Sequence, residues 1–331
     1  MKIVKVAGGL GNQMFQYAFA RALEARSGEE VYLDTSTYEY MPAHNGFELG
    51  RLFAVKYKVA REEDVRRLGT RPRSLLSKLR RKYCTKRTHY IDREFRYDPK
   101  VFTLKGDRYL EGYWQSEKYF APIADSLRRE FEFISDPGPQ NRQILEEAEK
   151  AGSAEASGRH ELVSVHVRRG DSLKLPETQV CTEAYYRNAL GLARQRFVRP
   201  HFLVFSDDLP WCRANLGLSK GDVTFVDWNR DADSWRDMWL MSRCSGHIIA
   251  NSSFSWWGAW LDPNPDKLVI VPDRWSLARH GPFSYYRYDF RDIVPESWVR
   301  VPVVRKRPSA RQAASHGQEG GNENSARRDQ R

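Results

Sequence analysis

Two arginines and a histidine stand in the sequence HVRRGD at residues 166–171, where a predicted strand ends. Side chains two residues apart in a strand point to the same face, so His166 and Arg168 share a face, and Gly170 permits a tight turn. A guanidinium matches phosphate oxygens and keeps its charge at neutral pH, so it can stabilise a diphosphate leaving group. A structural ion pair with Asp171 is the alternative. We expect both, with Asp171 holding one guanidinium and the other facing a ligand.

A second polar run, Asn251-Ser252-Ser253-Phe254, follows another predicted strand and opens a helix. Ser and Asn cap the free N–H groups of a helix start, and those N–H groups together with the helix dipole attract anions. Capping alone accounts for one serine but not for three polar residues in succession. We therefore expect a diphosphate between this helix start and the arginines Arg168 and Arg169.

A glycine-rich turn separates the first predicted strand from a helix. Gly9 and Gly11 match the start of a dinucleotide fingerprint, and Asp34 after the next strand is suited to a ribose, so an NAD-binding protein is one alternative. Met14 occupies the third glycine position, and the pair Asn12-Gln13 stands where a pyrophosphate needs bare backbone. These departures favour a helix start that approaches a sugar or another domain across a cleft, with two neutral amides offering hydrogen bonds.

Two acidic pairs and the cysteines bear on metal binding. Asp231 and Asp233 have the acid-x-acid form that binds a divalent ion on a nucleotide diphosphate, but acidic loops are common and the arginines already supply positive charge. The pair Asp207-Asp208 is expected to hold one helix N-cap and one ligand contact. The four cysteines are far apart and in no paired spacing, which excludes a Cys-x-x-Cys zinc site. We expect no metal and no cofactor.

Apolar runs and helical patterns alternate along the chain. Strands are predicted at 3–7, 31–33, 162–167, 201–205, 223–226, 247–250 and 268–271, and helices at 13–26, 141–150, 182–196, 234–245 and 256–261. This alternation indicates parallel sheets with crossover helices, in two doubly wound α/β domains. Ligands of such sheets bind beyond the carboxyl ends of the strands, where the polar runs described above are located.

Composition divides the 331 residues into segments. The small and polar residues 151–160 are predicted to link a domain at 1–150 to a domain at 161–304, and the polar, basic residues 305–331 are predicted to be disordered. No apolar stretch approaches the roughly 20 residues of a membrane span and no signal-peptide pattern is present, so a cytoplasmic protein is expected.

The formal net charge of +11 is concentrated in two places. Residues 71–88 contain eight Lys and Arg and no acid, the tail after 304 carries much of the remaining excess, and the rest is nearly neutral. The basic stretch at 71–88 suits an anionic membrane surface or a phosphate-bearing acceptor better than DNA. We expect no nucleic-acid partner. Peripheral contact with the inner membrane is one interpretation, and a solvated basic face is the other.

The chain resembles the bacterial α-1,2-fucosyltransferases of glycosyltransferase family 11 over roughly residues 1–300. The resemblance is carried, in the expected order, by GGLGNQMFQYA at 8–18, VHVRRGD at 165–171, DMWLMS at 237–242 and IIANSSFSWWGAWL at 248–261. It implies a GT-B fold, with two Rossmann-like domains facing a central cleft. It also implies inverting, metal-independent transfer of L-fucose from GDP-fucose to the 2-hydroxyl of galactose in a glycan acceptor.

The resemblance also assigns residues. It implies that the domain at 161–304 binds GDP-fucose and that the domain at 1–150 lies on the acceptor side. It places Arg168 and His166 at the leaving diphosphate, Asp237 at the guanosine, and Arg169 either at the donor or bracing its loop. The full set expected to bind the donor is Arg169, Asp171, Asp237, Asn251, Ser252, Ser253 and Phe254, with Gly11, Asn12 and Gln13 lining the cleft. A GDP-sugar enzyme of another linkage or sugar, and a basic nucleic-acid or membrane-surface protein, are the alternatives.

Overall fold

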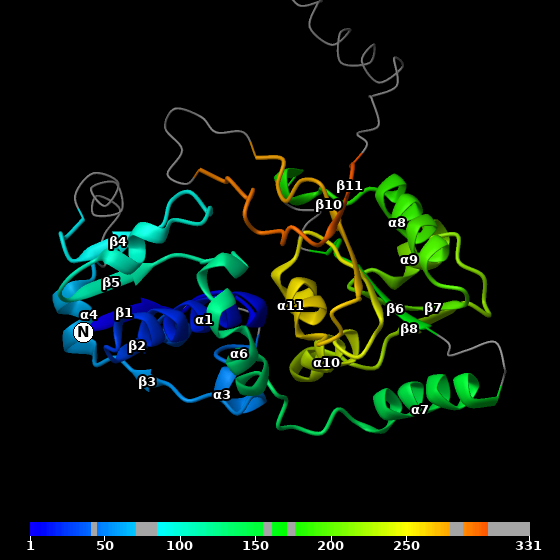
Figure 1. Cartoon of the computed structure of the whole chain (residues 1–331), viewed down its shortest axis with the longest axis horizontal. Helices are drawn as coiled ribbons and strands as arrows, with labels where there is room; N and C mark the ends of the chain where they lie inside the picture. The colour runs from blue at the N-terminus through cyan, green and yellow to red at the C-terminus, as the bar shows by residue number, and fades with distance from the viewer. Residues whose placement is uncertain (41–44, 71–84, 155–160, 171–175, 279–286, 304–331) are drawn as a thin grey trace, which may run out of the picture.

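The computed structural model of the chain describes residues 1–40, 45–70, 85–154, 161–170, 176–278 and 287–303 (Figure 1). Asp171, residues 71–84 of the basic stretch, residues 155–160 of the predicted linker and the predicted tail from 305 lie outside these ranges. The predictions made for them, and the two domain boundaries, stay predictions. Among the described helices, none combines the length and the apolar character that crossing a membrane requires.

The first sheet has five parallel strands in the order β3-β2-β1-β5-β4. Its strands are β1 (Lys2–Lys5), β2 (Val31–Asp34), β3 (Lys58–Val59), β4 (His89–Ile91) and β5 (Arg108–Glu111). Its helices and 3-10 turns are α1 (Leu10–Ser27), α2 (Thr37–Tyr40), α3 (Leu49–Leu52), α4 (Glu62–Leu68), η1 (Pro99–Thr103), η2 (Glu117–Tyr119), η3 (Ala121–Ile123) and α6 (Ala124–Glu130). Helix α1 ends at Gly28, which adopts a left-handed φ of 69° and donates its N–H to the carbonyl of Glu24.

The second sheet has six parallel strands in the order β11-β10-β9-β6-β7-β8. Its strands are β6 (Glu161–Val167), β7 (Pro200–Ser206), β8 (Val223–Val226), β9 (Gly246–Ile248), β10 (Leu268–Pro272) and β11 (Val299–Val301). The elements between them are η5 (Pro176–Thr178), α8 (Glu183–Arg196), α9 (Leu209–Asn215), η6 (Asp231–Asp233), α10 (Trp235–Met241) and α11 (Ser253–Leu261). Two parallel sheets with intervening helices confirm the predicted architecture of two Rossmann-like α/β domains.

Helix α7 (Pro139–Ala154) precedes the predicted linker. It lies beneath the second sheet in Figure 1, and its residues Ile144, Leu145 and Ala148 pack against the cluster that contains Leu162 and Leu203. By its packing this helix therefore belongs with the second sheet, although the sequence places it in the first predicted domain.

The two sheets are joined by an aromatic core between α1 and α11, which lie side by side at the centre of Figure 1. The ring of Phe15 lies 4.5 Å from that of Trp256 and 4.9 Å from that of Trp257, and Phe120 stacks on Trp257 at 5.5 Å. The Trp257 indole donates a 2.9 Å hydrogen bond to the Gly11 carbonyl. Because these rings are buried and belong to one hydrophobic cluster, the two domains are packed directly onto each other.

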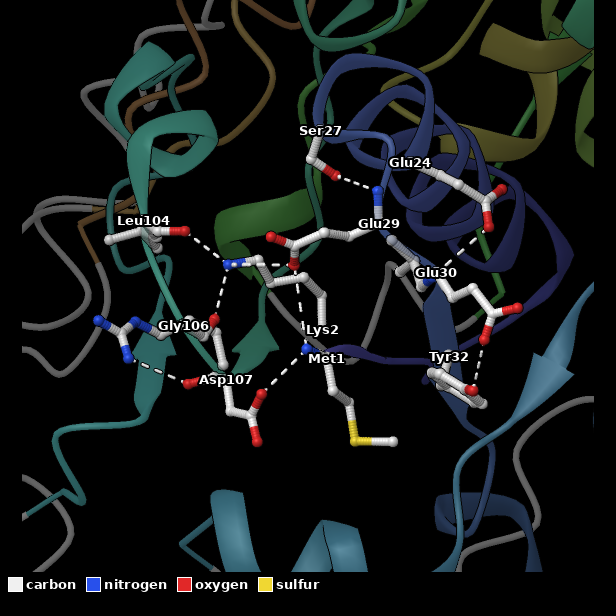
Figure 2. A network of polar contacts seen from close by, with 12 residues as sticks. Met1, Lys2, Glu24, Ser27, Glu29, Glu30, Tyr32, Leu104, Gly106 and Asp107 are labelled. Atoms are coloured by element: carbon white, nitrogen blue, oxygen red, sulfur yellow. Dashed lines mark hydrogen bonds and ion pairs between the residues drawn. The ribbon is translucent and has the colours of Figure 1, made fainter.

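A polar network holds the amino ends of the first sheet (Figure 2). The ammonium of Lys2, whose residue is only 3% exposed, donates to the carbonyls of Leu104 and of Gly106, the latter at 2.7 Å. The N-terminal ammonium donates to the Asp107 carboxylate at 2.9 Å. These bonds tie β1 to the turn that begins β5. The end of the sheet that holds the amino termini of the strands is thereby stabilised. The other end, where the strands have their carboxyl termini, faces the second domain.

Candidate active site

A cavity of about 930 Å³ lies between the two domains. This volume lies within the range usual for small-molecule sites. The first domain contributes the start of α1 and the loop before α3, and the second contributes the carboxyl ends of β6, β7 and β8 and the starts of α10 and α11. Lining residues that matter below are Gly11, Asn12, Asn45, Glu48, His166, Arg168, Asp207, Asn229, Asp237, Ser252, Ser253 and Phe254. Eight predicted site residues are thus brought together.

His166 is held by a serine of the helix start. Its Nδ1 lies 2.8 Å from the hydroxyl of Ser255, which also lies 3.4 Å from the Ser252 carbonyl. A carbonyl can only accept, so when the hydroxyl donates to Ser252 it accepts the Nδ1–H of His166 and Nε2 is the acceptor nitrogen of the ring; in the other tautomer the hydroxyl donates to Nδ1. Burial, with a smaller effect of the positive Arg168, lowers the pKa of His166 to about 3. The imidazole at the cavity is therefore neutral.

Arg169 does not line the cavity, unlike its neighbour Arg168. Its Nε donates to Asp208 at 2.9 Å, and its guanidinium lies 4.3 Å from the centre of the Trp211 ring. This placement matches the interpretation in which Arg169 braces the loop, with Asp208 as the acid that holds it. Asp208 also caps α9 through the N–H of Trp211, as predicted for one member of the Asp207-Asp208 pair.

Asp207 lines the cavity, but its carboxylate accepts hydrogen bonds from backbone N–H groups. Its two oxygens accept the N–H groups of Arg169 at 2.7 Å and Gly170 at 2.8 Å. The turn after β6 is thereby tied to the end of β7. Because Arg168 directly precedes this turn, Asp207 fixes the backbone next to Arg168, which lines the cavity together with Arg230.

The start of α11 carries the second predicted run. Ser252 is the N-cap and accepts the N–H of Phe254 at 3.3 Å, so the helix begins at the cavity wall. Asn251 has a different position from the one expected of a donor-binding residue. Its Nδ2 donates to the carbonyls of Thr178 at 2.9 Å and Trp275 at 3.0 Å, so this amide ties two loops together.

The three predicted cleft residues of the first domain differ in their positions relative to the cavity. Gly11 lies against the start of α11, and Asn12 lines the cavity while its Oδ1 accepts from Gln115 at 2.8 Å. Gln13 is fully buried, donates to the Gly46 carbonyl at 2.7 Å and accepts the N–H of Glu48 at 2.9 Å. Gln13 therefore positions the loop at 46–48, and it also donates to the Gly8 carbonyl at 3.2 Å, so it supports the cavity wall without lining it.

Two lining residues of that loop were missed by the sequence reasoning. Glu48 is buried at the cavity wall and accepts from Arg51 at 2.7 Å, and Asn45 donates to the Asp231 carbonyl in the other domain at 3.0 Å. Neither residue lies in a recognisable motif, and their loop is bound by Gln13 at Gly46 and Glu48. Of the acid pair tested for metal binding, Asp233 pairs with Arg236 at 3.1 Å. Within the described ranges, no three His, Cys, Asp or Glu side chains are grouped as metal ligands.

Asp237, in the first turn of α10, is the carboxylate whose pKa is most relevant to binding. Burial raises its pKa to about 7, and a hydrogen bond from Asn229 at 2.9 Å opposes part of this shift. In the described part of the chain, no lysine or arginine forms an ion pair with it. Near neutral pH the carboxyl therefore exchanges between its charged and protonated forms, and a ligand that donates N–H bonds favours the charged form.

Two α/β domains enclose a cavity lined by arginines and a helix N-terminus, an arrangement suited to a nucleotide-sugar transferase, and the family comparison shows the class to be that of the glycosyltransferases. Residues 1–282 match the model of Glycosyl transferase family 11, and the chain belongs to this family. It is 34% identical over 315 residues to an α-1,2-colitosyltransferase of Escherichia coli, covering 90% of this chain and 98% of that protein. This membership also disfavours the NAD-binding alternative.

Two further comparisons are more distant. The human galactoside α-(1,2)-fucosyltransferase 1 is 27% identical over 258 residues, which is 77% of this chain and 63% of that protein. A crystal structure of the fucosyltransferase NodZ from Bradyrhizobium is similar at a TM-score of 0.46 and 17% identity, over 78% of this chain and 91% of that one.

Proposed function

We propose that this glycosyltransferase moves L-fucose from GDP-fucose to the 2-hydroxyl of a galactose in a glycan acceptor, with inversion at the anomeric carbon. The observation that carries the proposal is the placement of Arg168, the start of α11 and Asp237 around one cavity. A cation and a helix N-terminus suit a diphosphate, and a carboxylate suits the two N–H donors on the edge of a guanine. The α-1,2 names of the relatives support the linkage.

The chemistry assigned to these residues is electrostatic. Breaking the bond between fucose and phosphate builds negative charge on the departing GDP and positive character on the sugar. Arg168 and the N–H groups that follow Ser252 stabilise that negative charge, and one such contact is typically worth about 100- to 1,000-fold in rate. We propose that no metal is required, because the guanidinium supplies the charge that a metal would provide. Asn12 and Glu48, on the opposite wall, then face the sugar and the acceptor.

A second candidate is the transfer of colitose from its GDP derivative. It is favoured by the 34% identity to an α-1,2-colitosyltransferase, which exceeds the identity to the fucosyltransferases. The diphosphate and guanine contacts are common to both donors, so the difference must lie where the sugar binds. Competition between the two GDP-sugars in one reaction, with products separated by mass, distinguishes the candidates.

A thermal-shift panel tests the donor. The full chain is melted with GDP, GDP-fucose, UDP, NAD or no ligand, each with and without EDTA. A ligand at 100 times its Kd adds about 2.7 kcal/mol of stability, which is readily measured. We expect stabilisation by GDP and GDP-fucose alone, equal in both buffers. Stabilisation by NAD without any effect of GDP would refute the proposal, and loss of the GDP effect in EDTA would refute its metal-independent form.

The acceptor and the linkage need a transfer assay. Galactose-terminated oligosaccharides are incubated with GDP-fucose, and the position of the new bond is read by NMR. Fucose on the galactose 2-hydroxyl is the expected product. Transfer to another hydroxyl, or to glycans without galactose only, would replace the proposal by a GDP-sugar transferase of another linkage.

A further inference from the structure

Asn141 is a buried amide far along the sequence from every predicted site residue. It lies in the first turn of α7 and is 1% exposed. Its Nδ2 donates to the Pro137 carbonyl at 2.6 Å, and its Oδ1 accepts the indole N–H of Trp228 at 3.0 Å. A carbonyl can only accept and an indole N–H can only donate. These two contacts therefore determine which end of the Asn141 amide carries the nitrogen.

This orientation is passed on to Asn229 through a reciprocal pair of bonds. Asn141 donates to Asn229 at 2.9 Å, and Asn229 donates back at 3.0 Å. The second N–H of the Asn229 amide donates to Oδ1 of Asp237 at 2.9 Å. If the Asn229 amide were reversed, its oxygen would oppose the Asp237 carboxylate. The contacts of Asn141 prevent that reversal, so Asp237 receives a donor.

The consequence concerns how Asp237 is presented to the cavity. A neutral amide binds one oxygen of the Asp237 carboxylate and leaves its negative charge in place. An ion pair with a lysine or arginine would neutralise that charge. A guanine offers N1–H and the 2-amino group to a carboxylate, hypoxanthine offers N1–H alone, and adenine has an acceptor at N1. A site built to accept both guanine donors rejects an analogue that lacks one of them.

We propose that Asn141 is a positioning residue that acts through Asn229 on Asp237, and thereby determines how strongly the cavity prefers guanine to other bases. The inference rests on the proposed GDP donor. Asn141 itself does not touch the ligand, because its amide is fully used by Pro137, Trp228 and Asn229. Its effect on binding must therefore pass through Asn229, which lines the cavity, and the proposal is that it reaches the base through the Asp237 carboxylate that Asn229 holds.

The test is a double-mutant cycle on base selectivity. The dissociation constants of GDP and inosine diphosphate are measured by calorimetry for wild type, Asn141→Ala, Asp237→Asn and the double variant. Gln143→Ala is the matched control, because Gln143 lies on the same helix but is exposed. We expect Asn141→Ala to reduce the GDP preference about tenfold, which is the value of one hydrogen bond of about 1.4 kcal/mol. In the Asp237→Asn background the same change should leave the preference unaltered.

Trp228→Phe provides a variant that keeps an aromatic ring at this position, although a smaller one, and removes the N–H to Asn141. It should lower the preference in the same direction, by less than Asn141→Ala, and it serves in place of Asn141→Ala if that variant does not fold. A lower melting temperature with an unchanged preference would refute the inference and leave Asn141 a purely structural residue. An equal loss of preference with and without Asp237 would refute it as well. Wild-type protein that binds neither nucleotide would instead refute the proposed function.

Discussion

Replacing Gly11 by alanine tests whether the two domains approach each other as closely as the structure shows. An ideal Cβ at this position lies 2.6 Å from the carbonyl carbon of Ser253 and 2.7 Å from the nitrogen of Phe254. Carbon atoms in contact lie about 3.5–4.0 Å apart, so the two helix starts must separate by about 1 Å. The atoms in the way are backbone of α11, so no side chain can rotate to make room.

The energetic cost follows from this overlap. Overpacking of this kind typically costs about 1–3 kcal/mol. For a domain of 150–250 residues each kcal/mol lowers Tm by about 2–4 °C, so we expect a drop of several degrees. The separation also stretches the bond from Trp257 to the Gly11 carbonyl and moves Ser252 and Ser253 away from the first-domain wall. A 1 Å displacement within a reaction geometry can cost about 100-fold in rate, so kcat/KM should fall by that order.

Gly191→Ala is the matched control. Gly191 also lies in a helix, and a Cβ there meets no atom within 4 Å. Alanine stabilises a helix interior relative to glycine by about 0.5–1 kcal/mol, so this variant should melt no lower than wild type and keep its kcat/KM. Tm is read by calorimetry and kcat/KM from GDP release. If Gly11→Ala behaves like Gly191→Ala in both measurements, the close packing of α1 on α11 is refuted.

Three further predictions concern the cavity. Arg168→Ala should lower kcat about 100- to 1,000-fold with Tm retained, whereas Arg169→Ala should mainly lower Tm; an unfolded Arg168→Ala would point to a structural role instead. The pKa of His166 is about 3 in the folded chain, against 6.5 for an unperturbed histidine, so the unfolded chain binds the extra proton and stability falls as pH drops below about 6.5. Urea unfolding at pH 7, 5 and 4 should show a smaller fall for His166→Gln, and equal falls would contradict the assignment. The pKa of Asp237, raised to about 7, means that GDP should bind more tightly at pH 8 than at pH 6, because the ionised carboxylate accepts the base. Titration calorimetry should show no such dependence in Asp237→Asn, and a dependence that persists there would assign it to another group.

The positions of the main strands along the chain, and of the cavity beyond their carboxyl ends, could be predicted from sequence. The strands β6, β7, β8 and β10 are apolar runs of four to seven residues followed by polar residues, so both their type and the site beyond them are visible locally. The strands β3, β4 and β11 contain only two or three residues. A segment that short has little periodicity, and it forms a strand because a neighbouring strand supplies backbone hydrogen-bond partners. The equally short β9 was predicted because its apolar run continues past its end to Ala250.

Which polar residues of a motif line the cavity was harder to predict. Asn251 and Gln13 stand in the same motifs as Ser252 and Asn12, yet their amides bind backbone carbonyls and hold loops. A motif identifies the stretch of chain at a site, but buried backbone groups near it must also find partners. Which side chain is used for that purpose depends on loops distant in sequence, such as the residues 46–48 that Gln13 holds.

The need of buried polar groups for partners also explains the role proposed for an asparagine on α7 that lies outside the motifs. A carboxylate near an apolar wall, such as Asp237, needs a neutral donor if its charge is to remain available to a ligand, and an amide donates only when its own orientation is determined. The orientation of the Asn229 amide is determined by a second amide, that of Asn141. The partners of Asn141 are a group that can only donate, the Trp228 indole, and a group that can only accept, the Pro137 carbonyl. No local pattern encodes such a chain of contacts across the 88 residues that separate Asn141 from Asn229. Base selectivity in this protein is therefore expected to depend on α7, the helix that composition assigns to the other domain.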